Sequence, residues 1–210
     1  MIKLLIADDH PIVREGLKQI IRNAPDIIIS GEANDGIEVI NKIKKENYDV
    51  ILLDISMPRK NGIEILNEIR KEKIKSRILI LSIHPEEQYA MRALKAGAYG
   101  YLTKDSVPNE LISAIRKVSM GEKYISLSLA EKLVDALKVG FDKSFHEALS
   151  NREYQVMLLL ASGKSMQEIA KELFLSVKTV STYKTRILKK MKMKNTFEII
   201  YYAIKNKLIE

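Results

Sequence analysis

The chain of 210 residues contains neither cysteine nor tryptophan, and aromatic residues make up only 6% of it. Without cysteine, disulfide bonds, thiolate metal sites and cysteine nucleophiles are excluded. No apolar run approaches the roughly 18 residues that a membrane-spanning helix needs. The short apolar run before Asp8 is too brief for a signal peptide. We therefore expect a cytoplasmic protein without a membrane partner.

Positive charge is concentrated in the last third of the chain. Residues 1–120 carry 19 Lys and Arg against 17 Asp and Glu, whereas residues 144–210 carry 12 against 6. A basic segment of this size indicates an anionic partner, with nucleic acid as the first candidate. Lysine-rich helices with solvated faces would give the same excess, so charge alone leaves both interpretations open.

The first 120 residues alternate short apolar runs with stretches of helical periodicity. The apolar runs predict five strands, at residues 2–7, 26–33, 49–54, 77–82 and 100–103. The stretches between and after them predict five helices, the last at about 107–119. Continuous apolar strands separated by amphipathic helices are typical of a parallel sheet covered on both faces. We expect an α/β doubly wound, five-stranded parallel sheet in residues 1–120.

The rest of the chain differs in pattern. Residues 121–146 are predicted to be a linker with a short helix, which a capping box at Ser128–Glu131 opens and Gly140 closes. Residues 147–210 are predicted to form an all-α domain of four helices. Their starts are marked by the capping residues Ser150, Ser165, Ser176 and Asn195.

Polar side chains stand at the carboxyl ends of four predicted strands. They are Asp8 and Asp9 after the first strand, Asp54 at the end of the third, Ser82 at the end of the fourth and Lys104 after the fifth. Ligands of open parallel sheets bind beyond these strand ends, so we expect the five residues to converge.

Three clustered carboxylates repel one another unless a cation joins them. Oxygen ligands in a partly open site suit Mg²⁺, with Mn²⁺ as the substitute. A lysine and a hydroxyl group beside them suit a phosphoryl group, because they neutralise and bind its oxygens. One carboxylate can then act as a nucleophile and form an acyl phosphate. Asp54 is the candidate, since it ends the central strand.

Four features of this region together resemble the receiver domain of two-component response regulators. They are the D-D-H-P run from Asp8, the D-x-x-M-P run from Asp54, the serine at a strand end and the Y-x-x-K run ending at Lys104. The resemblance covers residues 2 to about 120. It implies that Asp54 is phosphorylated by a partner histidine kinase. It further implies that Asp9, Asp54 and the backbone carbonyl of Ser56 bind Mg²⁺ directly, with Asp8 acting through water. Ser82 and Lys104 would bind the phosphoryl group, and Tyr101 would change rotamer on activation.

Residues 165–191 predict two helices joined by a tight turn. The apolar positions of the second helix are Val177, Val180, Tyr183, Ile187 and Met191. Its opposite face is small, hydroxylated and basic, which suits insertion into the DNA major groove. An ordinary amphipathic helix pair would show the same local pattern.

The longer run from Leu149 to Met191, with a fourth helix after it, is similar to the LuxR-type domain of NarL/FixJ response regulators. The sequence departs from the usual family residues at Ser181, Tyr183 and Thr196, which concerns the preferred DNA sequence. The resemblance implies DNA contacts along the second helix, at Lys178, Thr179, Ser181, Thr182, Lys184, Thr185, Arg186 and Lys189.

These observations favour a phosphorylation-dependent transcriptional regulator that binds double-stranded DNA and forms a homodimer on activation. It would catalyse only its own aspartyl phosphorylation and dephosphorylation. A metal-dependent phosphohydrolase or phosphotransferase acting on a small molecule is one alternative. A receiver with a protein-binding helical domain is another. The three histidines, His10, His84 and His146, are interpreted as solvated or packing residues because none has a partner at metal-ligand spacing.

Overall fold

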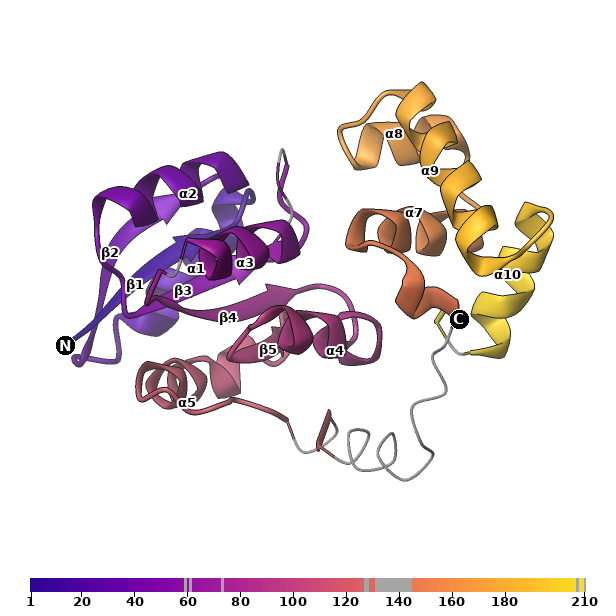
Figure 1. The fold of residues 1–210 in the computed structure, drawn as a ribbon. Coiled ribbons are helices and arrows are strands. Elements are labelled where there is room, and N and C mark those ends of the chain that lie inside the picture. The colour runs from indigo at the N-terminus through magenta and orange to yellow at the C-terminus, as the bar shows by residue number, and fades with distance from the viewer. Residues whose placement is uncertain are drawn as a thin grey trace. The chain divides into compact units, whose positions relative to one another are not determined.

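The computed structural model describes residues 1–58, 60, 62–72, 74–126, 129–130, 145–206 and 208–209. The chain divides into two compact units, Met1–Glu131 and Lys132–Glu210. Figure 1 shows a sheet with helices in the first unit and helices alone in the second. No helix of the described ranges combines the length and the apolar character that crossing a lipid bilayer requires.

The first unit contains one five-stranded sheet in which every strand pairing is parallel. Its order is β2-β1-β3-β4-β5. The prediction of a doubly wound parallel sheet is therefore confirmed, and β2 and β3 each begin one residue later than predicted. The strands are β1 (Ile2–Ala7), β2 (Ile27–Ala33), β3 (Val50–Asp54), β4 (Arg77–Ser82) and β5 (Gly100–Thr103).

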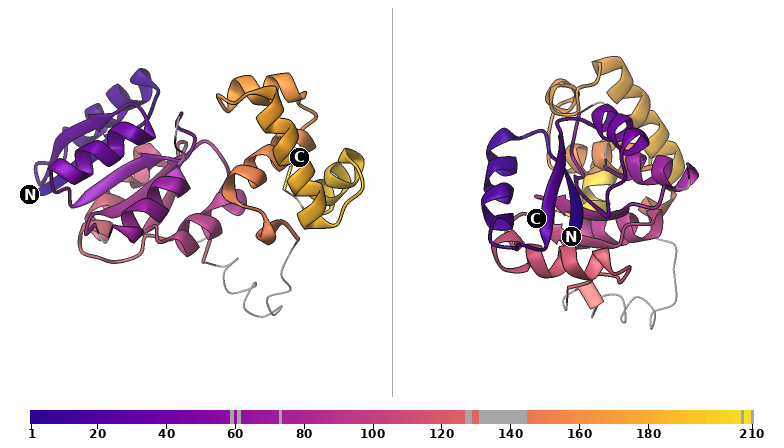
Figure 2. Two further views of the ribbon diagram at one scale, coloured as in Figure 1. Left: turned by 45° about the horizontal axis from the view of Figure 1, so that its top comes forward. Right: turned by 90° about the vertical axis from the view of Figure 1, so that its left-hand side faces the viewer.

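Helices cover both faces of this sheet, as Figures 1 and 2 show. The described residues of the first unit form five of them. Leu4, Leu52 and Leu81 pack with side chains of α1 and α5 in one core cluster. Their neighbours Leu5 and Leu53 are also buried, and they point to the opposite face because side chains alternate along a strand. Burial on both faces explains the uninterrupted apolar runs. The helices are α1 (Pro11–Ile21), α2 (Gly36–Lys45), α3 (Gly62–Lys71), α4 (Glu86–Ala96) and α5 (Val107–Ser119).

The strand order reverses between β1 and β3, so their carboxyl ends open the crevice in which ligands of such sheets bind. The chain folds back tightly just after β3. A Cβ atom at Gly62 would lie 2.9 Å from the backbone oxygen of Asp54, which leaves no room for a side chain. Glycine therefore lets α3 begin directly against the last residue of β3.

Residues 121–126 are packed on the first unit, although they were predicted to belong to the linker. Tyr124 forms a parallel bridge with Gly100, and its hydroxyl donates to Glu110 at 2.5 Å. The aromatic ring and these bonds hold the segment against the edge strand β5. Apart from residues 129–130, the helix predicted for 128–140 lies outside the described residues.

The regular elements in the described part of the second unit, residues 145–206 and 208–209, are all helical, as predicted. Two of the predicted capping residues, Ser150 and Ser165, form capping boxes, since they exchange hydrogen bonds with Glu153 and Glu168. The side chains of Ser176 and Asn195 also cap their helices. The elements are the 3₁₀ turn η1 (Phe145–Ala148) and the helices α7 (Asn151–Ala161), α8 (Met166–Glu172), α9 (Val177–Met191) and α10 (Thr196–Lys205).

The end of the predicted linker is packed against this second unit. His146 belongs to η1, and its Nδ1 atom lies 2.8 Å from the hydroxyl of Tyr202 in α10. Its ring also lies 5.7 Å from the ring of Tyr154 in α7. These contacts show that residues 145 and 146 are part of the helical unit, which the lack of periodicity in this segment did not reveal.

Candidate functional site

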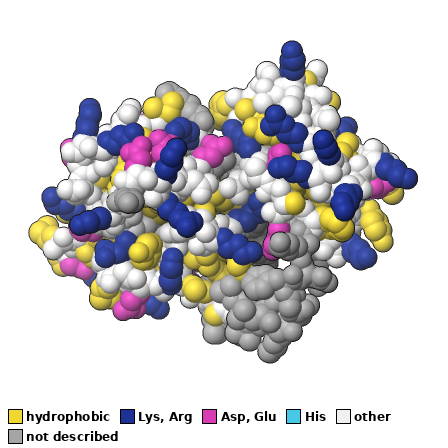
Figure 3. All heavy atoms as spheres, in the orientation of Figure 1, with side chains coloured by type: hydrophobic (Ala, Val, Ile, Leu, Met, Phe, Trp, Pro, Cys, Tyr) yellow, Lys and Arg dark blue, Asp and Glu magenta, His cyan; other side chains and the backbone are white. Residues whose placement is uncertain are grey.

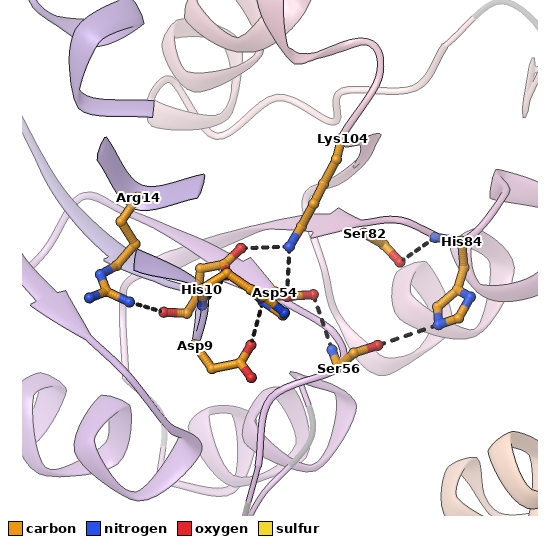
Figure 4. A network of polar contacts seen from close by, with 9 residues as sticks. Asp9, His10, Arg14, Asp54, Ser56, Ser82, His84 and Lys104 are labelled. Atoms are coloured by element: carbon orange, nitrogen blue, oxygen red, sulfur yellow. Dashed lines mark hydrogen bonds and ion pairs between the residues drawn. The ribbon is translucent and has the colours of Figure 1, made fainter. Parts of the chain in front are cut away.

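A cluster of charged side chains lies at the carboxyl edge of the sheet, as Figure 4 shows. Lys104 Nζ donates to Asp8 Oδ2 at 2.7 Å and to Asp54 Oδ2 at 2.9 Å. The side chains of Asp8 and Asp54 are only 0% and 3% exposed. Three residues that follow or end β1, β3 and β5 therefore meet as predicted, and one ammonium group bridges two buried carboxylates.

The electrostatics of this cluster favour a basic carboxylate beside a firmly charged lysine. Burial raises the pKa of Asp54 above its ordinary value, with Lys104 opposing the shift and Asp8 adding to it. Burial also disfavours the charge of Lys104, but Asp54 and Asp8 outweigh it, so the pKa of the ammonium group is raised. The lysine is thus held protonated where it can bind an anionic group.

The acidic residues fit a divalent cation. Asp9 Oδ1 is buried and accepts no hydrogen bond from the residues that the structure describes, although His10 Nδ1 lies 3.0 Å away. One potential ligand atom from each of Asp8, Asp9, His10 and Asp54 lies within 4.8 Å of the others. A buried carboxylate oxygen without a donor, among two further carboxylates, suits a hard cation such as Mg²⁺.

The two predicted switch residues bind the same short backbone segment. The buried Ser82 Oγ accepts from the backbone N–H of His84 at 3.0 Å. The hydroxyl of Tyr101, whose ring is fully buried, donates to the backbone oxygen of His84 at 2.9 Å. Ser82 and Tyr101 therefore both bind the backbone of His84, and the Tyr101 ring is buried in this structure.

Several contacts around the cluster have no local signal in the sequence. Arg14 Nη1 donates to the backbone oxygen of Asp8 at 2.7 Å. The backbone N–H of Ser56 donates to Asp54 Oδ1 at 3.1 Å, and its hydroxyl lies 3.4 Å from His84 Nε2. His84 also packs its ring 4.9 Å from that of Tyr89, which agrees with the prediction of a packing histidine. The contact between Ser56 and His84 joins two separate loops, and none of these contacts follows from a spacing pattern in the sequence.

The second candidate site is the outer face of α9. Val180, Ile187 and Met191 are buried, as predicted. Val177 was predicted to belong to the same core face, but it is 45% exposed. It is the first residue of α9, where the apolar stripe ends. Of the eight residues predicted to contact DNA, Thr179 and Lys184 are half-buried, and six are exposed: Lys178, Ser181, Thr182, Thr185, Arg186 and Lys189.

The threonines of this face bind back to their own helix. Thr182 Oγ1 donates to the backbone oxygen of Lys178 at 3.0 Å, and Thr185 Oγ1 donates to that of Ser181 at 3.1 Å. Their hydroxyl protons are thereby used, so toward solvent these side chains offer methyl groups and acceptor lone pairs. The face can therefore accept hydrogen bonds from base amino groups or contact thymine methyl groups.

Cations surround this face. An open hollow of about 570 Å³ is lined by Arg186, Lys189, Lys190 and Glu153. Lys190 Nζ, although exposed, donates to the buried Glu153 at 2.6 Å, and Arg186 and Lys189 are two further exposed cations that line the hollow. Figure 3 shows many Lys and Arg side chains and few acidic ones on the visible face of the second unit.

Comparison with known proteins identifies both units. Residues 4–116 match the family of response regulator receiver domains, and residues 147–203 match the bacterial regulatory proteins of the luxR family. The chain is 36% identical over 216 residues to the oxygen regulatory protein NreC of Staphylococcus epidermidis, covering 99% of both chains.

Solved structures agree with this match. RcsB from Salmonella enterica serovar Typhimurium, bound to promoter P1flhDC in the presence of the phosphomimetic BeF₃⁻, superposes with a TM-score of 0.65 at 28% identity, covering 96% of this chain and 97% of that one. The receiver domain of the putative response regulator NarL from Mycobacterium tuberculosis is 33% identical, with a TM-score of 0.55, covering 58% of this chain and 98% of that one.

A receiver unit joined to a LuxR-type helix-turn-helix unit defines a response regulator with a DNA-binding output. The chain belongs to the NarL/FixJ-type response regulators and is a phosphorylation-dependent regulator of transcription. This family assignment favours the first of the three functions considered from the sequence over the small-molecule enzyme and the protein-binding output.

Proposed function

We propose that a receiver domain in residues 1–120 accepts a phosphoryl group on Asp54 from the phosphohistidine of a sensor histidine kinase. A DNA-binding domain in residues 147–210 would respond through the linker. The observation that carries the proposal is the Lys104 bridge between the buried carboxylates of Asp8 and Asp54. Of the three predicted acids, Asp54 alone is the last residue of a strand, the central strand β3, which borders the strand-order reversal.

In the transfer, a carboxylate oxygen of Asp54 attacks phosphorus while the bond from phosphorus to the imidazole nitrogen breaks and the imidazole leaves. Lys104 neutralises charge on the phosphoryl oxygens, and Ser82 donates a hydrogen bond to one of them. Asp8, Asp9, Asp54 and the carbonyl of Ser56 would hold Mg²⁺, or Mn²⁺ in its place. The bound cation would neutralise the charge that the acid cluster and the phosphoryl group bring together.

Phosphorylation of Asp54 would change the conformation of the receiver domain through Ser82 and Tyr101. It adds charge and acceptor oxygens that draw the Ser82 hydroxyl toward Asp54. Ser82 and Tyr101 both bind the backbone of His84. A displacement of the Ser82 hydroxyl would therefore move His84 and change the position that the Tyr101 hydroxyl favours. We propose that phosphorylation in this way stabilises the conformation in which Tyr101 is buried.

The experiment compares Asp54→Asn with the wild type. Each protein is incubated with acetyl phosphate and Mg²⁺, and the intact mass is measured. The wild type should gain one phosphoryl group, and the substituted protein should gain none. Asp49→Asn is the matched control, since Asp49 lies outside the cluster and accepts only from the backbone of Lys3 among the bonds described. Modification of the Asp54 variant at the wild-type rate would refute the assignment.

The output is proposed to be dimeric binding to double-stranded DNA through α9, in the cytoplasm, with no enzymatic activity toward other substrates. One helix reads only a few base pairs, whereas two copies on a two-fold axis read two half-sites. The exposed side chains of Phe197, Tyr201 and Ile204 lie along α10 at helical spacing and offer an apolar surface for the second copy.

This part is tested by selection from randomised duplex DNA with and without acetyl phosphate, followed by footprinting on the selected site. We expect phosphorylation to increase the retained DNA and the footprint to cover two half-sites. A footprint of a single half-site, or equal retention in both conditions, would contradict the proposed output.

A further inference from the structure

Two exposed apolar residues flank the beginning of the helix that is proposed to bind DNA. Phe174, in the turn before α9, is 70% exposed, and Val177, the first residue of α9, is 45% exposed. Ser176 lies between them and caps the helix by accepting from the backbone N–H of Thr179 at 3.0 Å. Neither residue is among the buried core residues, so core packing does not account for the apolar surface that they leave exposed.

The backbone does not explain Phe174 either. Its φ of 53° lies in the left-handed region, which disfavours residues with a Cβ atom and suits glycine or asparagine. The turn is held on both sides of Phe174. Arg152 Nη2 donates to the backbone oxygen of Leu173 at 3.0 Å, and the N–H of Leu175 donates to that of Ala170 at 2.8 Å. The aromatic ring therefore has a conformational cost and no compensating contact in the core.

The surroundings of the pair indicate its partner. Lys178 and Ser181, which follow on α9, are exposed and were predicted to contact DNA. An apolar group beside cations suits a polyanion that also presents apolar atoms. In the major groove the C5-methyl group of thymine is the apolar group on the base edges.

We propose that Phe174 and Val177 form an apolar edge that contacts thymine methyl groups, at the end of each half-site nearest the N-terminus of α9. The proposal rests on the proposed DNA-binding function and adds a preference for thymine at one position. Ser181, Thr182 and Thr185 would read the neighbouring base pairs.

The experiment uses the full-length phosphorylated protein and a duplex selected from a random library. Each thymine is replaced in turn by deoxyuridine, which lacks only the C5-methyl group, and affinity is measured. We expect a thymine at the end of each half-site nearest the N-terminus of α9 to be sensitive, with a loss of about fourfold for the roughly 0.8 kcal/mol of one buried methyl group. Replacements outside the half-sites serve as controls and should leave affinity unchanged.

The same titrations are made with Phe174→Gly and Val177→Ala. If these side chains contact the methyl group, both variants should bind the thymine duplex more weakly and lose sensitivity to deoxyuridine at that position. Phe174→Gly should also unfold at a higher temperature, because glycine relieves the left-handed backbone. If both variants keep the wild-type sensitivity to deoxyuridine at that position, the proposal is overturned, even if Phe174→Gly is more stable than the wild type.

Two further outcomes are distinct from that one. If no thymine of the half-site is sensitive in the wild type, the apolar edge has another partner, such as a protein surface, and the proposal is wrong. If the wild-type protein retains no duplex from the library, the proposed DNA-binding function itself fails.

Discussion

Lys104 and Lys178 are both cations at candidate binding sites, but their surroundings are opposite. Lys104 binds two buried carboxylates from segments that lie 96 and 50 residues away in the chain. Lys178 lies on the exposed face of one helix, α9, beside the other residues of its site. The geometry of the receiver cluster thus requires several strands of the sheet to be in place, whereas the geometry of the α9 face requires only one helix and its cap. Substitutions in the first should affect both stability and function, and those in the second should affect function alone.

The largest expected effect is that of Lys104→Met. This change leaves the buried carboxylates of Asp8 and Asp54 without their shared counter-charge, and breaking a buried pair in this way costs about 3–5 kcal/mol. We expect urea denaturation at pH 7 to show a loss of this order in the free energy of unfolding. Because a cation could replace the missing charge, Mg²⁺ should restore part of it.

Lys178→Met is the matched control for this comparison. Its ammonium group is exposed, so the free energy of unfolding should change by less than about 0.5 kcal/mol. Equal losses in the two variants would show that the two sites do not differ in the way their burial indicates.

The second prediction separates two kinds of residue within the α9 face. Thr182→Ala removes an outward methyl group and an acceptor, so it should relax the preference at one base pair of each half-site by about 1–3 kcal/mol. Lys189→Ala should weaken binding to all sequences alike and reduce the salt slope by about one unit. Competition binding and salt titration measure these effects. Identical behaviour of both variants would contradict the assigned docking.

The smallest expected effect concerns Glu153, where the second unit contains a buried carboxylate of its own. Burial raises the pKa of Glu153, but the hydrogen bonds from Lys190 and Ser150 outweigh burial and hold the pKa below its ordinary 4.5. The folded state therefore favours the charged form. Its stabilising contribution is complete above the ordinary pKa and is lost as the pH falls through the lower pKa of the folded state.

Glu153→Gln should accordingly destabilise the protein by about 1 kcal/mol near pH 7, and the difference from the wild type should shrink below about pH 4. Thermal unfolding followed across this range measures both. Glu172→Gln is the control, since the Glu172 pair with Lys164 is exposed and should contribute less than about 0.5 kcal/mol. A constant difference at every pH would exclude the ionisation of Glu153 as the cause.

Much of this architecture was predictable because it depends on local patterns. The strands were located to within one residue from apolar runs, and four helix starts were located from Ser150, Ser165, Ser176 and Asn195. The parallel order of the sheet then brings the ends of β1, β3 and β5 together, since parallel strands finish at the same edge. For this reason the amino-acid sequence suffices to predict that Asp8, Asp54 and Lys104 form one cluster.

Other features were decided only by tertiary structure. Periodicity placed Val177 on the core face, but a helix buries only the turns that have a neighbour, and the first turn of α9 leaves this residue exposed. Residues 121–126 lack periodicity, yet Tyr124 joins them to β5 through a ring and a bridge. The Ser82, His84 and Tyr101 contacts likewise join β5 to the segment after β4.

The helices and strands and the polar groups at the strand ends could thus be predicted from the amino-acid sequence, because they follow from residue-by-residue periodicity and capping. Tertiary structure alone decided which oxygen of each carboxylate Lys104 binds, that Tyr101 is buried, and that Phe174 and Val177 stay exposed. These features depend on which surfaces meet after the chain has folded, and residues far apart in sequence contribute to each of them.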